Sequence, residues 1–88
     1  MLNYDKETFE LIKNWDVIKD AKGLVTYLKS IWAWDNYIAI KGKKVWRVEI
    51  HTGGFSEHEA IIKALPNMFW DIYFEKEIKG GHYYFKIK

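Results

Sequence analysis

Hydrophobic and polar residues alternate along three stretches of the chain, as in β-strands whose sheet is covered on one face. The stretches are 44–51, 68–78 and 83–88, and the pattern predicts a shorter strand over 37–40. The residues predicted to face the core are Ile38, Ile40, Trp46, Val48, Ile50, Trp70, Ile72, Phe74, Tyr83, Phe85 and Ile87. We expect the opposite, exposed face to carry Tyr37, Arg47, Phe69, Tyr73, His82 and Tyr84.

Apolar residues spaced three or four apart predict three amphipathic helices. The helices cover 6–15, 21–34 and 56–65. Asp5 and Asp20 are suited to cap the first two, and Pro66 should prevent the third from continuing. The predicted order is ααββαββ, which describes an α+β fold with a four-stranded, mainly antiparallel sheet packed on one face by helices. Sheet order cannot be read from this pattern.

The composition predicts a single domain over residues 1–88. Aromatic residues make up 18% of the chain, and large buried rings compensate for its small size. Cysteine is absent, which excludes disulfides and thiolate metal sites and favours a cytoplasmic protein. The segment from Met1 to Lys6 lacks the pattern of a signal peptide, and no apolar run approaches the roughly 18 residues that span a bilayer. A net charge of +2 argues against a dedicated nucleic-acid binder.

A pair of glycines separates the strand predicted over 44–51 from the helix predicted over 56–65. Ser56, followed by Glu59, matches a capping box at the start of that helix. Backbone N–H groups of such a turn could also hold an anion or a nucleotide. The candidate anion-binding residues are Gly53, Gly54, Phe55 and Ser56. We favour the interpretation that this turn only joins the strand to the helix and binds no anion, because Glu57 and Glu59 already place negative charge at the helix start.

Three strings of the second half occur in a characteristic order. They are His51-Thr52-Gly53-Gly54-Phe55-Ser56, then Phe69-Trp70, then Gly80-Gly81-His82-Tyr83. From Lys44 onward the chain resembles a family of small, largely uncharacterised proteins found mainly in bacteriophages and prophages. Members of that family usually have Trp at the position of Phe55. The resemblance implies no catalytic residue; it implies an accessory protein that binds and blocks a host factor in the host cytoplasm.

The three histidines could coordinate zinc together with nearby carboxylates. The side chains considered are His51, His58, His82, Glu57, Glu59 and Asp71. Their spacing matches no standard ligand signature, so we expect neither a metal nor a cofactor. Ser56 with His58 or His82 could form a nucleophile pair, but no Gly-x-Ser-x-Gly elbow is present. We therefore expect no catalytic residues and no enzymatic activity.

The candidate partner-binding residues are Trp34, Tyr37, Arg47, Tyr73, His82 and Tyr84. Trp32 is expected in the core, and Trp34 cannot face the same way, so it should be exposed. Three interpretations of the aromatic and basic face stay open: cross-strand pairing, a protein partner, or stacking of single-stranded nucleic acid. The leading hypothesis is a phage-type, protein-binding accessory protein that inhibits a host factor. An exposed Trp34 also leaves a homo-oligomer open.

Overall fold

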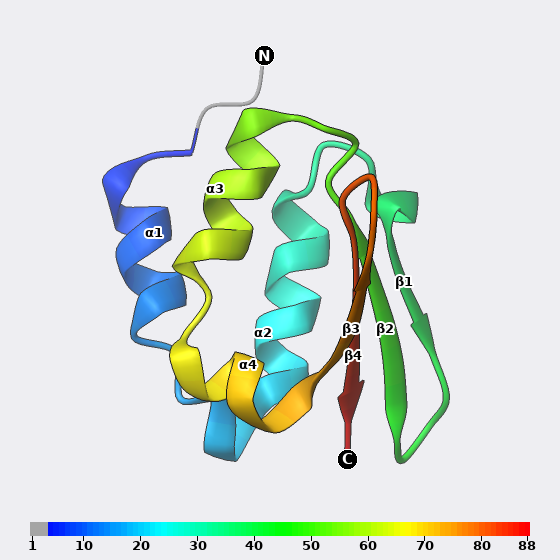
Figure 1. Cartoon of the computed structure of the whole chain (residues 1–88). Helices are drawn as coiled ribbons and strands as arrows, with labels where there is room; N and C mark the ends of the chain where they lie inside the picture. The colour runs from blue at the N-terminus through cyan, green and yellow to red at the C-terminus, as the bar shows by residue number, and fades with distance from the viewer. Residues whose placement is uncertain (1–3) are drawn as a thin grey trace.

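A computed structural model describes residues 4–88 of the chain (Figure 1). The elements are α1 (Lys6–Lys13), α2 (Val17–Ile31), a short 3-10 helix η1 (Asp35–Tyr37), β1 (Ile38–Lys41), β2 (Trp46–His51), α3 (Ser56–Ala64), α4 (Asn67–Tyr73), β3 (Phe74–Ile78) and β4 (His82–Ile87). The predicted α+β class and the predicted order of helices and strands are confirmed, with α4 as an addition. Met1 to Asn3, which contributed to the expectation about a signal peptide, lie outside the described residues.

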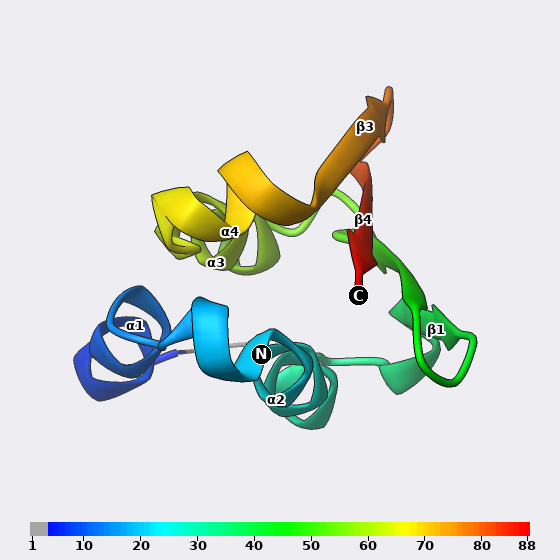
Figure 2. The same ribbon diagram turned by 90° about the horizontal axis from the view of Figure 1, so that it is seen from below.

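The four strands form one sheet in the order β1-β2-β4-β3, and every neighbouring pair is antiparallel. Figure 2 shows the α-helices on one side of the sheet, while its other face is covered by no helix of residues 4–88. On β2 and β4 alternate residues are buried against the helices, as predicted for Val48, Phe85 and Ile87. The predicted core positions Ile72 and Phe74 are wrong, because both side chains are exposed, as are all residues of β3. We call the uncovered side of the sheet the open face.

The second half of the described chain repeats the order of the first half, helix–helix–strand–strand. The two hairpins, β1–β2 and β3–β4, meet through their later strands, so that β2 pairs with β4 in the middle of the sheet. Across the same division α1 packs against α3 and α2 against α4, as Figure 2 also shows. The core therefore lies between two similar halves, although the sequence has no recognisable internal repeat.

Aspartates begin the first two helices. The Asp5 carboxylate accepts a hydrogen bond from the backbone N–H of Thr8 at 2.9 Å, which confirms the predicted cap and lowers the pKa of Asp5. Helix α2 begins earlier than predicted, after a cap by Asp16, and kinks at Asp20, whose φ of −146° is not helical. Asp20 still acts as a cap inside α2, because its carboxylate accepts from the N–H of Gly23 at 3.0 Å.

The predicted long strand over 68–78 is wrong in its first part, where the chain forms α4 and passes directly into β3. Phe69 was predicted on the exposed face, but its side chain is 0% exposed and contacts Phe85 in the core. Pro66 occupies the N-cap of α4, so the residue that ends α3 also begins the next helix. Burial of Phe69 on a helix thus overrides the strand preference of an aromatic-rich segment.

Candidate functional site

The strand register arranges the open face in three rows of directly opposed residues. The basic row is Lys41, Arg47 and Lys86 on β1, β2 and β4. The middle row is Ala39, Glu49, Tyr84 and Lys76, and the third row contains His51, His82 and Ile78. Opposed residues point to the same side of a sheet. Each row therefore forms a continuous strip of side chains across several strands.

Four rings follow one another at one end of the open face, and we call them the histidine column: Trp34, Tyr37, His51 and His82. The last three are stacked, whereas the Trp34 ring is tilted by 40° against Tyr37. The ring centroids are 5.3 Å apart for Trp34 and Tyr37, 4.6 Å for Tyr37 and His51, and 4.0 Å for His51 and His82. The Nδ1–H of His82 donates to the carboxylate of Glu49 at 3.0 Å. One face of the His51 ring therefore lies against Tyr37 and the other against His82.

A hollow of about 220 Å³ lies on the open face beside the column. Its lining includes Lys41, Arg47, Glu49, Glu75, Lys76 and Tyr84, which come from all four strands. The ammonium group of Lys76 lies 5.1 Å from the centre of the Tyr84 ring. Desolvation, followed by the Glu49 carboxylate, raises the pKa of Tyr84. The hollow thus combines cations, carboxylates and one phenol.

The two glycine pairs, widely separated in the sequence, meet at one corner of the molecule. The N–H of Thr52 donates to the carbonyl of Gly81 at 3.0 Å, and a Cβ on Gly81 would overlap the Thr52 hydroxyl oxygen. Behind this corner, the Tyr83 hydroxyl donates to a carboxylate oxygen of Glu59 at 3.3 Å. Burial, reinforced by nearby glutamates, raises the pKa of Tyr83 to about 12. The corner fixes the register that puts His51 opposite His82.

The predicted capping box at the start of α3 is wrong. Phe55 is the N-cap, and no side chain caps the helix. Ser56 is the first helical residue, and its hydroxyl donates to the Glu57 carboxylate at 3.3 Å. The N-cap lies at Phe55 rather than at Ser56 for a local reason. The N–H of Phe55 donates to the Thr52 carbonyl at 3.2 Å, which closes the turn one residue earlier than predicted. Anion binding at Gly53, Gly54, Phe55 and Ser56 stays a prediction.

His58 lies in the core and is 0% exposed. Its Nδ1–H donates to the Thr52 carbonyl at 2.9 Å, its Nε2 accepts from the N–H of Ala33 at 3.4 Å, and its ring stacks on Trp32 at 4.2 Å. It therefore ties the glycine corner to the end of α2. The helical spacing from His58 to the buried Ile61 could have indicated this role. Among residues 4–88, no three His, Asp or Glu side chains are grouped to hold a metal ion.

The structure brings most of the predicted contact residues together. Trp34 is 47% exposed, as predicted, and Tyr37, Arg47, His82 and Tyr84 lie on or beside the open face. The predicted sheet-face position of Tyr73 is wrong, because α4 turns it toward α2 and its hydroxyl donates to the Val17 carbonyl at 2.9 Å. Sequence reasoning did not include Lys86 and Glu49 among the contact residues, because their opposition to Arg47 and Tyr84 depends on the pairing of β2 with β4.

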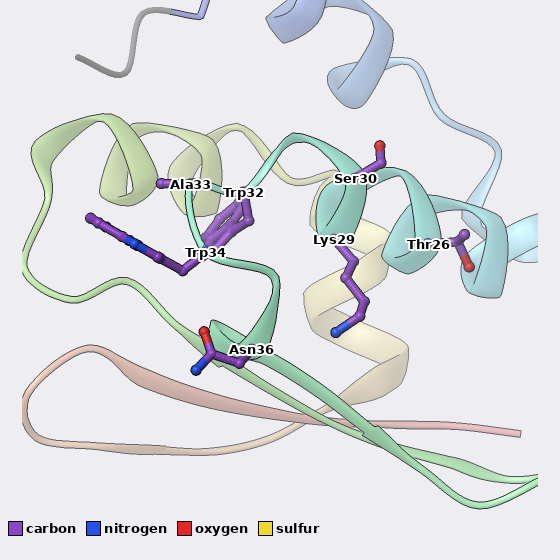
Figure 3. A pocket seen from close by; sticks show the side chains of 7 residues that line it. All are labelled: Thr26, Lys29, Ser30, Trp32, Ala33, Trp34 and Asn36. Carbon is purple, nitrogen blue, oxygen red and sulfur yellow. The ribbon is translucent and has the colours of Figure 1, made fainter.

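A second hollow, of about 610 Å³, lies beside Trp34 at the C-terminal end of α2 (Figure 3). In Figure 3 the Lys29 side chain reaches from α2 toward the sheet, where its ammonium group donates to the Ile38 carbonyl at 2.7 Å. Lys29 therefore helps hold α2 against β1. Among residues 4–88 no buried side-chain nitrogen or oxygen lacks a hydrogen-bond partner, so nothing in this hollow indicates a ligand and we assign no site to it.

Within the described part of the chain, no helix is both long and apolar enough to cross a membrane. Comparison with known proteins gives no match, whether to a protein-family model, a curated protein or a solved structure.

Proposed function

We propose that this protein is a small phage-type accessory protein that binds a protein partner through its open face and inhibits that partner by covering its surface. The observation that carries the proposal is the open face itself, which no helix of residues 4–88 covers and which presents Tyr84 and Arg47, with the exposed Trp34 ring beside one end of it. Trp, Tyr and Arg are the residues most enriched at the energetic centres of protein interfaces. The exposed Trp34 ring supplies an apolar contact at one end of the histidine column, and the hollow supplies a recess in the sheet.

The arrangement of the rings favours a protein over single-stranded nucleic acid. Base stacking needs free ring faces, but both faces of His51 are covered by neighbours in the histidine column. One face of Tyr84 carries the Lys76 ammonium group. Glu49 and Glu75 also line the hollow and would repel a continuous phosphate backbone. Side chains of a protein can match this mixture of charges residue by residue.

The test is capture of a partner from a bacterial lysate with the tagged protein, followed by titration calorimetry with the purified partner. We expect Tyr84→Ala to weaken binding at least tenfold, because it removes an aromatic ring that lines the hollow. Tyr73→Phe is the matched control. Tyr73 was also predicted to contact the partner, but its hydroxyl bonds to the backbone of α2, away from the open face. The control variant should leave the affinity within about twofold.

Both variants must first show a cooperative urea transition, so that misfolding is excluded. If Tyr84→Ala and Trp34→Ala both leave the affinity for the partner unchanged, the open face is not the docking surface. A titration with oligothymidylate at low salt is expected to be flat. If oligothymidylate quenches tyrosine fluorescence, with an affinity that falls steeply as the salt concentration rises, nucleic-acid binding replaces the proposal.

A further inference from the structure

The basic row places three cations in one line across the sheet. Lys41 is directly opposite Arg47, and Arg47 is directly opposite Lys86. The Cβ atoms of directly opposed residues lie roughly 4.5–5.5 Å apart, and like charges at that distance destabilise a sheet. Within residues 4–88 none of the three forms an ion pair, since the salt bridge on this face joins His82 to Glu49. The three cations therefore lie in line without a direct ion pair, although the carboxylates of Glu49 and Glu75 line the hollow beside Lys41 and Arg47.

An anionic group from outside would relieve that repulsion. Lys41 and Arg47 both line the hollow, and Lys76 faces it from β3, so cations approach it from two sides. Arg47 is exposed on the second strand of the sheet and has the planar fork that binds carboxylates in a bidentate manner. The basic row and the hollow together form a recess for negative charge.

We propose that the open face receives an acidic segment of the partner protein, with its carboxylates seated on the basic row. The inference rests on the proposed function and specifies the chemistry of the partner. Neighbouring strands lie roughly 4.8 Å apart, and alternate side chains of an extended segment roughly 6.6 Å apart. The two cation pairs, Lys41 with Arg47 and Arg47 with Lys86, are centred one strand spacing apart, and the long Lys and Arg side chains can spread to meet two carboxylates at positions i and i+2 of the segment.

Glu49 and Glu75 limit the negative charge that the face accepts. Both carboxylates line the hollow within reach of the same ligand. A short acidic segment can place its carboxylates on the basic row and turn neutral or basic residues toward these glutamates. A nucleic-acid strand would carry a phosphate past them at every nucleotide. Local negative charge is thus accepted, and an extended polyanion is disfavoured.

The closing experiment uses the full chain and the partner captured by it. Arg47→Glu puts a carboxylate between Lys41 and Lys86, so it should raise the urea midpoint while it weakens partner binding at least tenfold. The matched control is Lys63→Glu, which makes the same change of charge at an exposed position on α3. It should move affinity by less than twofold. A purely structural role for Arg47 would not give higher stability together with weaker binding.

A second, independent measurement uses peptides rather than the partner. We expect a blocked octapeptide with glutamate at alternate positions to shift the amide resonances of Arg47 and Lys86, and the glutamine version of the same peptide to leave them unchanged. If Tyr84→Ala abolishes partner binding but Arg47→Glu and Lys86→Glu do not, the acidic segment is refuted and the proposed function stands. If none of the three variants affects binding, both proposals fall. Shifts caused by oligothymidylate but not by the glutamate peptide would also overturn the inference.

Discussion

Gly81→Ala offers the sharpest test of how the glycine corner is built. Gly81 has a φ of +84°, and a Cβ there would overlap the hydroxyl oxygen of Thr52, which is itself fully buried. Gly54 is a matched control, because its φ of +76° is similar and a Cβ there would meet no atom within 4 Å. Comparing alanine at the two positions therefore separates the effect of close packing from that of backbone conformation.

The expected magnitudes follow from this geometry. A left-handed conformation costs alanine about 1–2 kcal/mol, and the stiffer unfolded chain returns about 0.4–1 kcal/mol. Gly54→Ala should therefore lose about 1 kcal/mol of unfolding free energy. Gly81→Ala adds the overlap with Thr52, and overpacking of this kind costs about 1–3 kcal/mol. We expect its total loss to be about 2–4 kcal/mol.

Urea denaturation followed by tryptophan fluorescence measures these differences. With an m value of about 1 kcal/mol/M, the midpoint of Gly81→Ala should lie about 1–3 M below that of Gly54→Ala. In a Thr52→Ala background the extra loss should disappear, because the overlapping oxygen is gone. Equal losses for the two glycine variants would refute the close approach of the two glycine motifs.

Two further predictions concern buried polar groups. His58→Phe keeps an aromatic ring in the core but leaves the Thr52 carbonyl and the Ala33 N–H unpaired, so unfolding free energy should fall by about 2–4 kcal/mol in the same urea assay; a loss below about 1 kcal/mol would contradict the bonding described. Because desolvation, followed by two nearby glutamates, raises the pKa of Tyr83 from 10.0 to about 12, the folded state holds the phenolic proton more tightly. The contribution of this proton to the free energy of unfolding is complete below pH 10 and is lost as the pH rises through 12. If the free energy of unfolding of Tyr83→Phe declines equally between pH 10 and 12, Tyr83 is not the group responsible.

The strands over 44–51 and 83–88 could be predicted because each alternates along its whole length, and burial of Val48 and Phe85 follows the same period. The segment that became α4 also alternates, but two contacts distant in sequence decide its form. Phe69 packs on Phe85, and the Tyr73 hydroxyl bonds to the first turn of α2. Local pattern contains no information about either contact, so this helix could not be predicted.

For the candidate site, the exposure of Trp34 was predictable, because Trp32 already occupies the core. The basic row was not, since the opposition of Arg47 and Lys86 depends on β2 pairing with β4. Strand order in a sheet is set by packing of the whole molecule rather than by neighbouring residues. His58 was misjudged for a related reason: its two hydrogen-bond partners are backbone groups, which a sequence does not display as a motif.

The central pairing of β2 with β4 has a consequence for how the protein folds. Each hairpin closes through a short turn. The pairing of β2 with β4 forms only when the long segment between them, which contains α3, α4 and β3, has folded back on itself. Closing such a segment carries an entropic penalty that adjacent hairpins avoid. We therefore expect docking of the two hairpins to be the slow step of folding, and either half of the chain alone would lack the central β2–β4 pairing.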